Sequence, residues 1–239
     1  MPKPNPGLTV VRPVPTIVCI NNATEDLGVD FDRLIAALQK YLDKHFVPVW
    51  GTPAKLEKGK KPRRGTWTLM FLDHQDSAKA KREKWVGLHH LEGDPFAKVF
   101  VKSVLDSDEK VSVAASHELA EMLVDPGINL WCVGPKGLLY AYEVCDAVEE
   151  VEFLVDGIPM CNFVYPTYFD RSRKPRSAQF DHKKKLNRPF QLLTKGYATV
   201  LKNGKKVEIF GSTKKQKHFA KENRGGHRSE RRGEVSTIP

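Results

Sequence analysis

The sequence contains no apolar run that approaches the roughly 20 residues a membrane-spanning helix requires, so we expect no membrane partner. The first 15 residues carry five prolines and no continuous apolar segment, and we therefore expect no signal peptide. The four cysteines form no C-x-x-C pair and no dense framework, which is typical of reduced, mostly buried thiols. Together these absences predict a cytoplasmic protein.

Common nucleotide-binding and nucleophile motifs are also missing. The chain has no G-x-x-x-x-G-K phosphate loop, no G-x-G-x-x-G turn and no G-x-S-x-G elbow. These absences argue against nucleotide-binding and serine-hydrolase functions.

Positive charge is concentrated at the C-terminal end. The net charge is +10, and half of this excess lies in residues 212–239, which hold eight Lys or Arg and three Glu. Such a segment is typical of a solvated arm and predicts accessory, nonspecific nucleic-acid binding. We accordingly divide the chain into an extended Pro-rich arm (residues 1–15), one domain (residues 16–211) and a basic disordered tail (residues 212–239).

The order of the expected elements predicts a mixed α/β (α+β) fold. Asp30 is placed to cap a helix whose apolar residues recur every three or four positions. Asn203-Gly204 joins two β-rich runs and predicts a C-terminal β-hairpin over residues 197–210, and Asp156-Gly157 is a second hairpin signal. Apolar runs predict strands at residues 16–20, 46–50, 66–72, 97–101 and 161–165.

Residues 111–126 (VSVAASHELAEMLVDP) are the most informative stretch. Apolar spacing predicts a helix, which Pro126 ends because proline removes a backbone donor and disfavours helical geometry at the preceding residue. His117 and Glu121 are four residues apart and therefore project from one face. This is the layout of the zinc-protease helix H-E-x-x-H with its second histidine replaced by glutamate.

Polar side chains inside an apolar helix need a partner, because uncompensated burial costs roughly 2–7 kcal/mol for a neutral group. A metal ion is one partner. A hydrolytic zinc site takes three protein ligands, an open position for water, and a base. We predict His117 and Glu121 as two ligands, and Glu118, about 100° around the helix from His117, as the base that activates a metal-bound water. The third predicted ligand is Glu143, 26 residues after His117.

Two more carboxylates belong to this hypothesis. Asp146 either orients His117 from the second shell or exchanges roles with Glu143. Asp125 lies on the His117 face at position i+8, where it is an alternative ligand or a residue that turns the chain before Pro126. The predicted cofactor is zinc. Another divalent cation is the alternative, because glutamate in place of histidine makes the site harder.

Four further residues are candidates for lining this site. His89 and His90 either add a ligand or belong to a sheet edge. Tyr165 and Tyr168, on either side of Pro166, either form a wall on the substrate side or pack in the core.

Two functions follow from these patterns. The first is a metal-dependent hydrolase, specifically a metallopeptidase acting on a peptide or protein substrate. The second is a catalytically inactive scaffold or binding protein, in which the buried histidine and carboxylates form a structural network. Chelation separates the two, since only the first loses stability with its metal.

Several strings in the chain resemble those of a known family. They are SHELAEMLVDP, then Trp131, then EVCDAVE, NFVYPTYFD and Phe180-Asp181. They are similar to a family of uncharacterised bacterial and phage-borne proteins with H-E-x-x-E-x-x-x-D-P followed by E-x-x-D. More distantly they resemble the plant phosphate-induced, Exordium-like extracellular proteins.

The resemblance spans about residues 46–197. It implies a zincin-like metallopeptidase domain, in which a mixed twisted sheet lies over a central active-site helix. The chain departs from the plant proteins in two ways. They are secreted, and their cysteine follows the aspartate, whereas here Cys145 precedes Asp146.

Overall fold

The computed structural model describes residues 13–74, 87–149 and 151–214. Most of the predicted Pro-rich arm and of the basic tail lies outside these residues, and so do the nucleic-acid contacts predicted for the tail. The described chain contains both helices and strands, and the strands form three separate sheets. This confirms a mixed α/β fold. Within the described residues, no helix combines the length and apolar character needed to cross a bilayer.

The larger sheet has five strands in the order β2-β1-β3-β5-β4. β1 pairs in parallel with β2 and β3, β3 pairs in parallel with β5, and β4 runs antiparallel to β5 at the edge. The central strands are apolar and largely buried, as parallel strands covered on both faces must be. The bounds are β1 (Thr16–Asn21), β2 (Lys55–Lys58), β3 (Trp67–Leu72), β4 (Gly87–Glu92) and β5 (Asp94–Phe100).

The first helix begins where the sequence predicts. The Asp30 carboxylate accepts a hydrogen bond from the Arg33 backbone N–H at 3.0 Å, and α1 (Phe31–Tyr41) follows. The helix continues as a π-helical turn, η1 (Leu42–Phe46), and then as α2 (Val47–Trp50). It ends at Gly51, which has the left-handed conformation common after a helix.

The strand predicted at residues 46–50 is therefore wrong. Pro48 lies in the first turn of α2, directly after the π-helical turn, and the helix continues through it. Phe46 is fully buried and packs against Tyr41 and Phe163. This aromatic packing favours a continued helix over the local strand preference of the sequence FVPVW.

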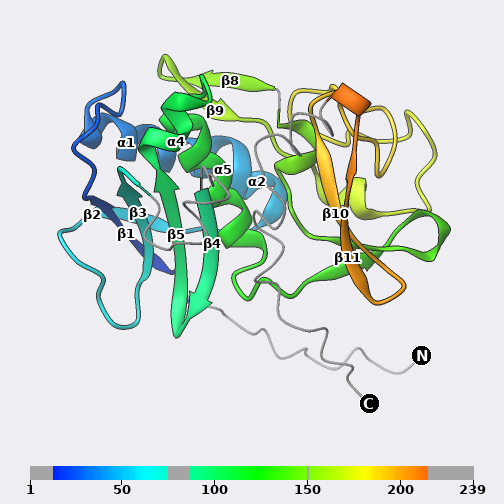
Figure 1. Ribbon diagram of the computed structural model, residues 1–239, viewed down its shortest axis with the longest axis horizontal. Helices are drawn as coiled ribbons and strands as arrows, with labels where there is room; N and C mark the ends of the chain where they lie inside the picture. The colour runs from blue at the N-terminus through cyan, green and yellow to red at the C-terminus, as the bar shows by residue number, and fades with distance from the viewer. Residues whose placement is uncertain (1–12, 75–86, 150, 215–239) are drawn as a thin grey trace, which may run out of the picture.

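The central helix, α5 (Val111–Val124), follows the short helix α4 (Val101–Asp106). It contacts α1, β4 and β5 and the strand β9 (Ile158–Cys161). Figure 1 shows α5 in the middle of the molecule, with the five-stranded sheet and the β10–β11 hairpin toward opposite ends of the long axis. All but two of its fourteen residues are buried, so α5 is an interior helix and not an amphipathic surface helix.

The second sheet is antiparallel, with four strands in the order β11-β10-β7-β6. Its hairpin confirms the C-terminal prediction, because Asn203 and Gly204 both have positive φ as a type I′ turn requires. The bounds are β6 (Trp131–Val133), β7 (Leu139–Ala141), β10 (Tyr197–Lys202) and β11 (Lys205–Phe210).

The remaining sheet is the hairpin of β8 (Glu152–Val155) and β9, turned at Asp156-Gly157 as predicted. The strand predicted at residues 161–165 is not continuous. β9 ends at Cys161, and Val164 makes a single bridge to Asp181. Three short 3₁₀ turns complete the description: η2 (Pro135–Gly137), η3 (Asp146–Val148) and η4 (Pro166–Phe169).

Candidate metal centre

The polar residues of α5 lie inside the protein. His117 is 4% exposed, and Glu118 and Glu121 are fully buried. Their neighbours in the helix, such as Leu119 and Ala120, are fully buried as well. The helix therefore brings an imidazole and two carboxyl groups into an interior where each needs a compensating partner.

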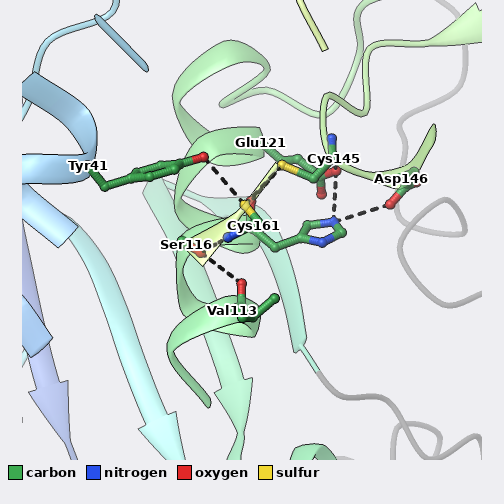
Figure 2. A network of polar contacts seen from close by, with 8 residues as sticks. Tyr41, Val113, Ser116, Glu121, Cys145, Asp146 and Cys161 are labelled. Carbon is green, nitrogen blue, oxygen red and sulfur yellow. Dashed lines mark hydrogen bonds and ion pairs between the residues drawn. The ribbon is translucent and has the colours of Figure 1, made fainter. Parts of the chain in front are cut away.

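One imidazole nitrogen faces two carboxylates (Figure 2). His117 Nε2 lies 2.9 Å from Glu121 Oε1 on the same helix and 3.2 Å from Asp146 Oδ1 in η3. A single N–H donates best to one acceptor at a time, so the two oxygens compete for a hydrogen bond from Nε2. Two carboxylates that converge on one nitrogen are also the arrangement of a metal-ligand set.

Contacts from three segments hold Asp146 at this point. The Cys145 N–H donates to Glu121 Oε1 at 3.2 Å, which ties the residue before Asp146 to the helix. The Val164 N–H donates to the Val144 carbonyl at 2.7 Å, and the Leu193 N–H donates to the Ala147 carbonyl at 3.0 Å. These bonds fix the backbone on both sides of Asp146.

Negative charge is concentrated around Glu121. Burial raises the pKa of the Glu121 carboxyl to about 7; the charge of His117 lowers it, and the charges of Asp146 and Glu143 raise it. A carboxyl group with this pKa is only partly ionised at neutral pH. A cation placed between these groups would favour the ionised form, because opposite charges stabilise each other strongly in a buried site.

The other carboxylates predicted for the site are buried nearby. Glu143, in the loop after β7, is 4% exposed and acts on Glu121 through its charge. Asp125 ends α5, and its carboxylate accepts the backbone N–H groups of Asn129 and Leu130 at 3.0 Å each. Asp125 thus turns the chain after the helix. This is the second of the two roles that its position predicted.

The residues predicted to line the site occupy different surroundings. His89 and His90 lie in β4, a strand that contacts α5, but their side chains are outside the described part of the structure. Tyr168 is buried, and the nearby charge of Asp146 contributes, after burial itself, to raising the pKa of its hydroxyl. Within the described residues, the Tyr168 hydroxyl has no hydrogen-bond partner.

Tyr165 belongs to a second polar network. Its hydroxyl lies 3.2 Å from His182 Nδ1, and His182 Nε2 lies 3.0 Å from His45 Nδ1. Burial lowers the pKa of His182 to about 4, with further lowering by the charges of His45 and Lys183. Burial also lowers the pKa of His45. Both imidazoles are therefore mainly neutral at pH 7, and one donates its N–H to the other.

Cys145 is a candidate ligand that sequence reasoning missed. Donor atoms of His117, Glu121 and Cys145 all lie within 4.8 Å of one another. The sequence pattern predicts only a buried thiol at Cys145, because the residue has no spacing typical of a metal ligand. Its position directly before Asp146 was the available signal, because any loop that delivers Asp146 to the helix also delivers its neighbour.

The donor atoms are of types that a transition-metal ion binds. Zinc bonds of 2.0–2.2 Å to nitrogen and oxygen hold two donor atoms roughly 3.3–3.6 Å apart in tetrahedral geometry. The distances of 2.9 and 3.2 Å from His117 Nε2 are shorter than this separation and lie within the range of N–H···O hydrogen bonds, so zinc binding would require the donors to move slightly apart. Imidazole and carboxylate are also ligand types that zinc accepts.

The comparisons with other proteins leave the site to be interpreted from its own residues. They find no match to this chain among family models, curated proteins or solved structures.

Proposed function

We propose that the chain is a metal-dependent hydrolase with a zinc-peptidase type of site. The observation that carries the proposal is the convergence of Glu121 Oε1 and Asp146 Oδ1 on His117 Nε2. The proposed ligands are His117 and Glu121 from α5 and Asp146 from η3. Glu143 then has a supporting role. The sequence predicts Glu143 as the third ligand and Asp146 as the orienting residue, so the proposal exchanges their roles.

The contact with Nε2 favours Asp146 as a ligand over Asp146 as an orienting group. A carboxylate that orients a metal-bound histidine accepts the proton of the ring nitrogen that does not bind the metal. Here Asp146 and Glu121 face the same nitrogen. Asp146 is therefore in the position of a ligand.

Glu118 is the proposed base. It follows His117 directly and projects about 100° around the helix. It is fully buried and belongs to the same helix as the two proposed ligands His117 and Glu121. A zinc ion, when bound, lowers the pKa of its water ligand and polarises a carbonyl group. Glu118 would take the proton of that water and later pass it to the leaving amine.

The arrangement of α5 and the sheet supports a zincin-like assignment. The five-stranded sheet is mixed, with three parallel pairings and one antiparallel edge strand, β4. α5 contacts both β4 and the adjacent strand β5. A helix beside an antiparallel sheet edge suits a peptide substrate, because an extended peptide can pair with an edge strand. On this basis we propose a peptide or protein as the substrate.

One observation favours the alternative of an inactive scaffold. The Cys145 N–H donates to Glu121 Oε1, and the Cys161 N–H donates to Ser116 Oγ at 2.9 Å. Some polar groups around the site are thus satisfied by the protein itself, and a structural network needs no more than this. Chelation decides between the two, because a scaffold keeps its melting temperature without metal.

The test is metal analysis of the purified full chain, followed by peptide hydrolysis assays of Glu118→Gln. We expect about one zinc per chain and a melting temperature that falls on chelation. We also expect Glu118→Gln to retain zinc while losing hydrolysis by at least about a hundredfold. The control is Asp106→Asn, which changes an exposed carboxylate on α4. This variant should leave both the zinc content and the hydrolysis rate unchanged. A chain that binds no zinc and is indifferent to chelator would refute the proposal.

A further inference from the structure

Two thiols lie next to the proposed ligands on α5. Cys145 Sγ and Cys161 Sγ are 3.5 Å apart, and both residues are buried. Figure 2 shows both cysteines beside Glu121, with Cys161 on the side of Tyr41. Cys145 comes from the loop that carries Asp146, whereas Cys161 ends β9.

Polar contacts hold each cysteine to the ligand helix. The Cys145 N–H donates to Glu121 Oε1, and Cys145 Sγ lies 4.0 Å from the His117 carbonyl oxygen. The Cys161 N–H donates to Ser116 Oγ, which in turn donates to the Val113 carbonyl at 3.0 Å. The two sulfurs are therefore presented to each other by backbones that are fixed to the same helix.

The sulfur of Cys161 has a second polar neighbour. Tyr41 OH lies 3.4 Å from Cys161 Sγ. Either atom can donate in this contact and in the contact between the two sulfurs. A cysteine that lies against a second thiol can form a disulfide once it is oxidised to a sulfenic acid.

We propose that Cys145 and Cys161 are a site of reversible oxidation that controls cation binding at His117, Glu121 and Asp146. A disulfide requires an S–S separation of about 2.05 Å, so the sulfurs must approach by roughly 1.5 Å. That movement draws Cys145 toward β9. It pulls the Cys145 N–H from Glu121 and shifts Asp146, the next residue, relative to His117. The effect on cation binding rests on the function proposed above, whereas the disulfide does not.

The oxidant is a small hydroperoxide, because the burial of both sulfurs excludes larger disulfides. In the first step Cys161 sulfur attacks the peroxide, an S–O bond forms, the O–O bond breaks, and the thiol proton leaves with the departing oxygen as water or alcohol. In the second step Cys145 sulfur attacks the sulfenic acid, the S–S bond forms, the S–O bond breaks, and water leaves with the Cys145 proton. Two thiols are oxidised and one peroxide is reduced.

The experiment uses the full chain carrying Cys132→Ser, which removes the half-buried thiol of β6. The protein is treated with hydrogen peroxide, digested without reductant and mapped by mass spectrometry. Zinc affinity is measured against a competing chelator before treatment, after treatment, and after dithiothreitol. We expect a Cys145–Cys161 cross-linked peptide and a loss of zinc affinity of at least about tenfold. Dithiothreitol should restore both.

Cys161→Ser is the matched variant, with Cys161→Ala as a second variant if the first does not fold. Either should bind zinc as the parent does and be insensitive to peroxide. The thiol-pair proposal is overturned if treated protein shows no cross-link, or if the cross-link forms while zinc affinity stays unchanged. If the reduced protein binds no zinc, the proposed function fails, and peptide mapping alone then confirms or refutes the oxidation site.

Discussion

Asp146 Oδ1 lies 3.2 Å from the same nitrogen of His117 that Glu121 contacts. Glu121 belongs to α5, whereas Asp146 begins η3, 29 residues after His117 in the chain. Their meeting at one atom makes the ligand assignment testable by single substitutions.

The first prediction ranks the two downstream carboxylates. Asp146→Asn should lower zinc affinity by at least about a hundredfold, because it removes a ligand charge next to Nε2. Glu143→Gln should lower it by about tenfold or less, because we propose Glu143 as a supporting residue and not as a ligand. Both are measured by competition with a chelator, and the reverse order would make Glu143 the ligand.

The second prediction concerns pH. The pKa of Glu121 is raised from 4.5 to about 7 in the folded protein. In the metal-free protein, the raised pKa of Glu121 therefore stabilises the folded state fully below pH 4.5. This stabilisation is lost as the pH rises through 7. Zinc binding has the opposite dependence, because the ligand must be ionised, so its affinity should fall by about tenfold per pH unit below pH 7.

Melting curves with zinc and with chelator check this prediction. They should diverge progressively between pH 5 and pH 8. Glu121→Gln is the control, since it has no carboxyl group to titrate and should remove most of the divergence. Parallel curves for the parent protein would show that Glu121 does not bind the cation.

The third prediction concerns Gly196, which precedes β10. A Cβ at this position would lie 2.3 Å from the Ala147 carbonyl oxygen and 3.1 Å from that of Asp146. Gly196→Ala should therefore displace η3, costing about 1–3 kcal/mol of stability and weakening zinc binding by about tenfold.

Gly134→Ala is the matched control for Gly196→Ala. Its Cβ would meet the Tyr140 ring at 2.3 Å, so it should destabilise the protein without the same effect on zinc. Denaturant unfolding and chelator competition measure the two properties. Equal losses of zinc affinity in both variants would contradict the bracing of Asp146 by residues near Gly196.

The fourth prediction concerns His182. Its pKa falls from 6.5 to about 4 on folding, first because of burial and then because of the charges of His45 and Lys183. Stability is fully present above pH 6.5 and is lost as the pH falls toward 4. His182 is half-buried, so screening reduces this loss to about 1–2 kcal/mol. His182→Gln should flatten the pH dependence of denaturant unfolding between pH 6.5 and 4.5. An unchanged pH dependence in this variant would show that His182 does not cause the loss of stability.

Much of the fold could be predicted from local signals. The Asp30 cap, the Pro126 stop and the turns at Asp156-Gly157 and Asn203-Gly204 act within a few residues, and the structure confirms all four. The failure at residues 46–50 has the opposite cause. There the aromatic contacts of Phe46 with residues distant in sequence override the local strand preference.

The candidate site could be predicted only in part for the same reason. Helical spacing places His117 and Glu121 together, and their contact needs no tertiary information. Between Glu143 and Asp146, spacing gives no preference, because the segment is irregular and not helical. The place of Asp146 beside His117 depends on hydrogen bonds that Val164 and Leu193 donate to the residues around it, which no local pattern reveals.

The bond from Leu193 to Ala147 also has a consequence for biosynthesis. A nascent chain that has emerged only through η3 already contains His117, Glu121 and Asp146, but it lacks the residues that hold η3 against α5. At the proposed site, cation capture would therefore wait until the segment leading into β10 has left the ribosome.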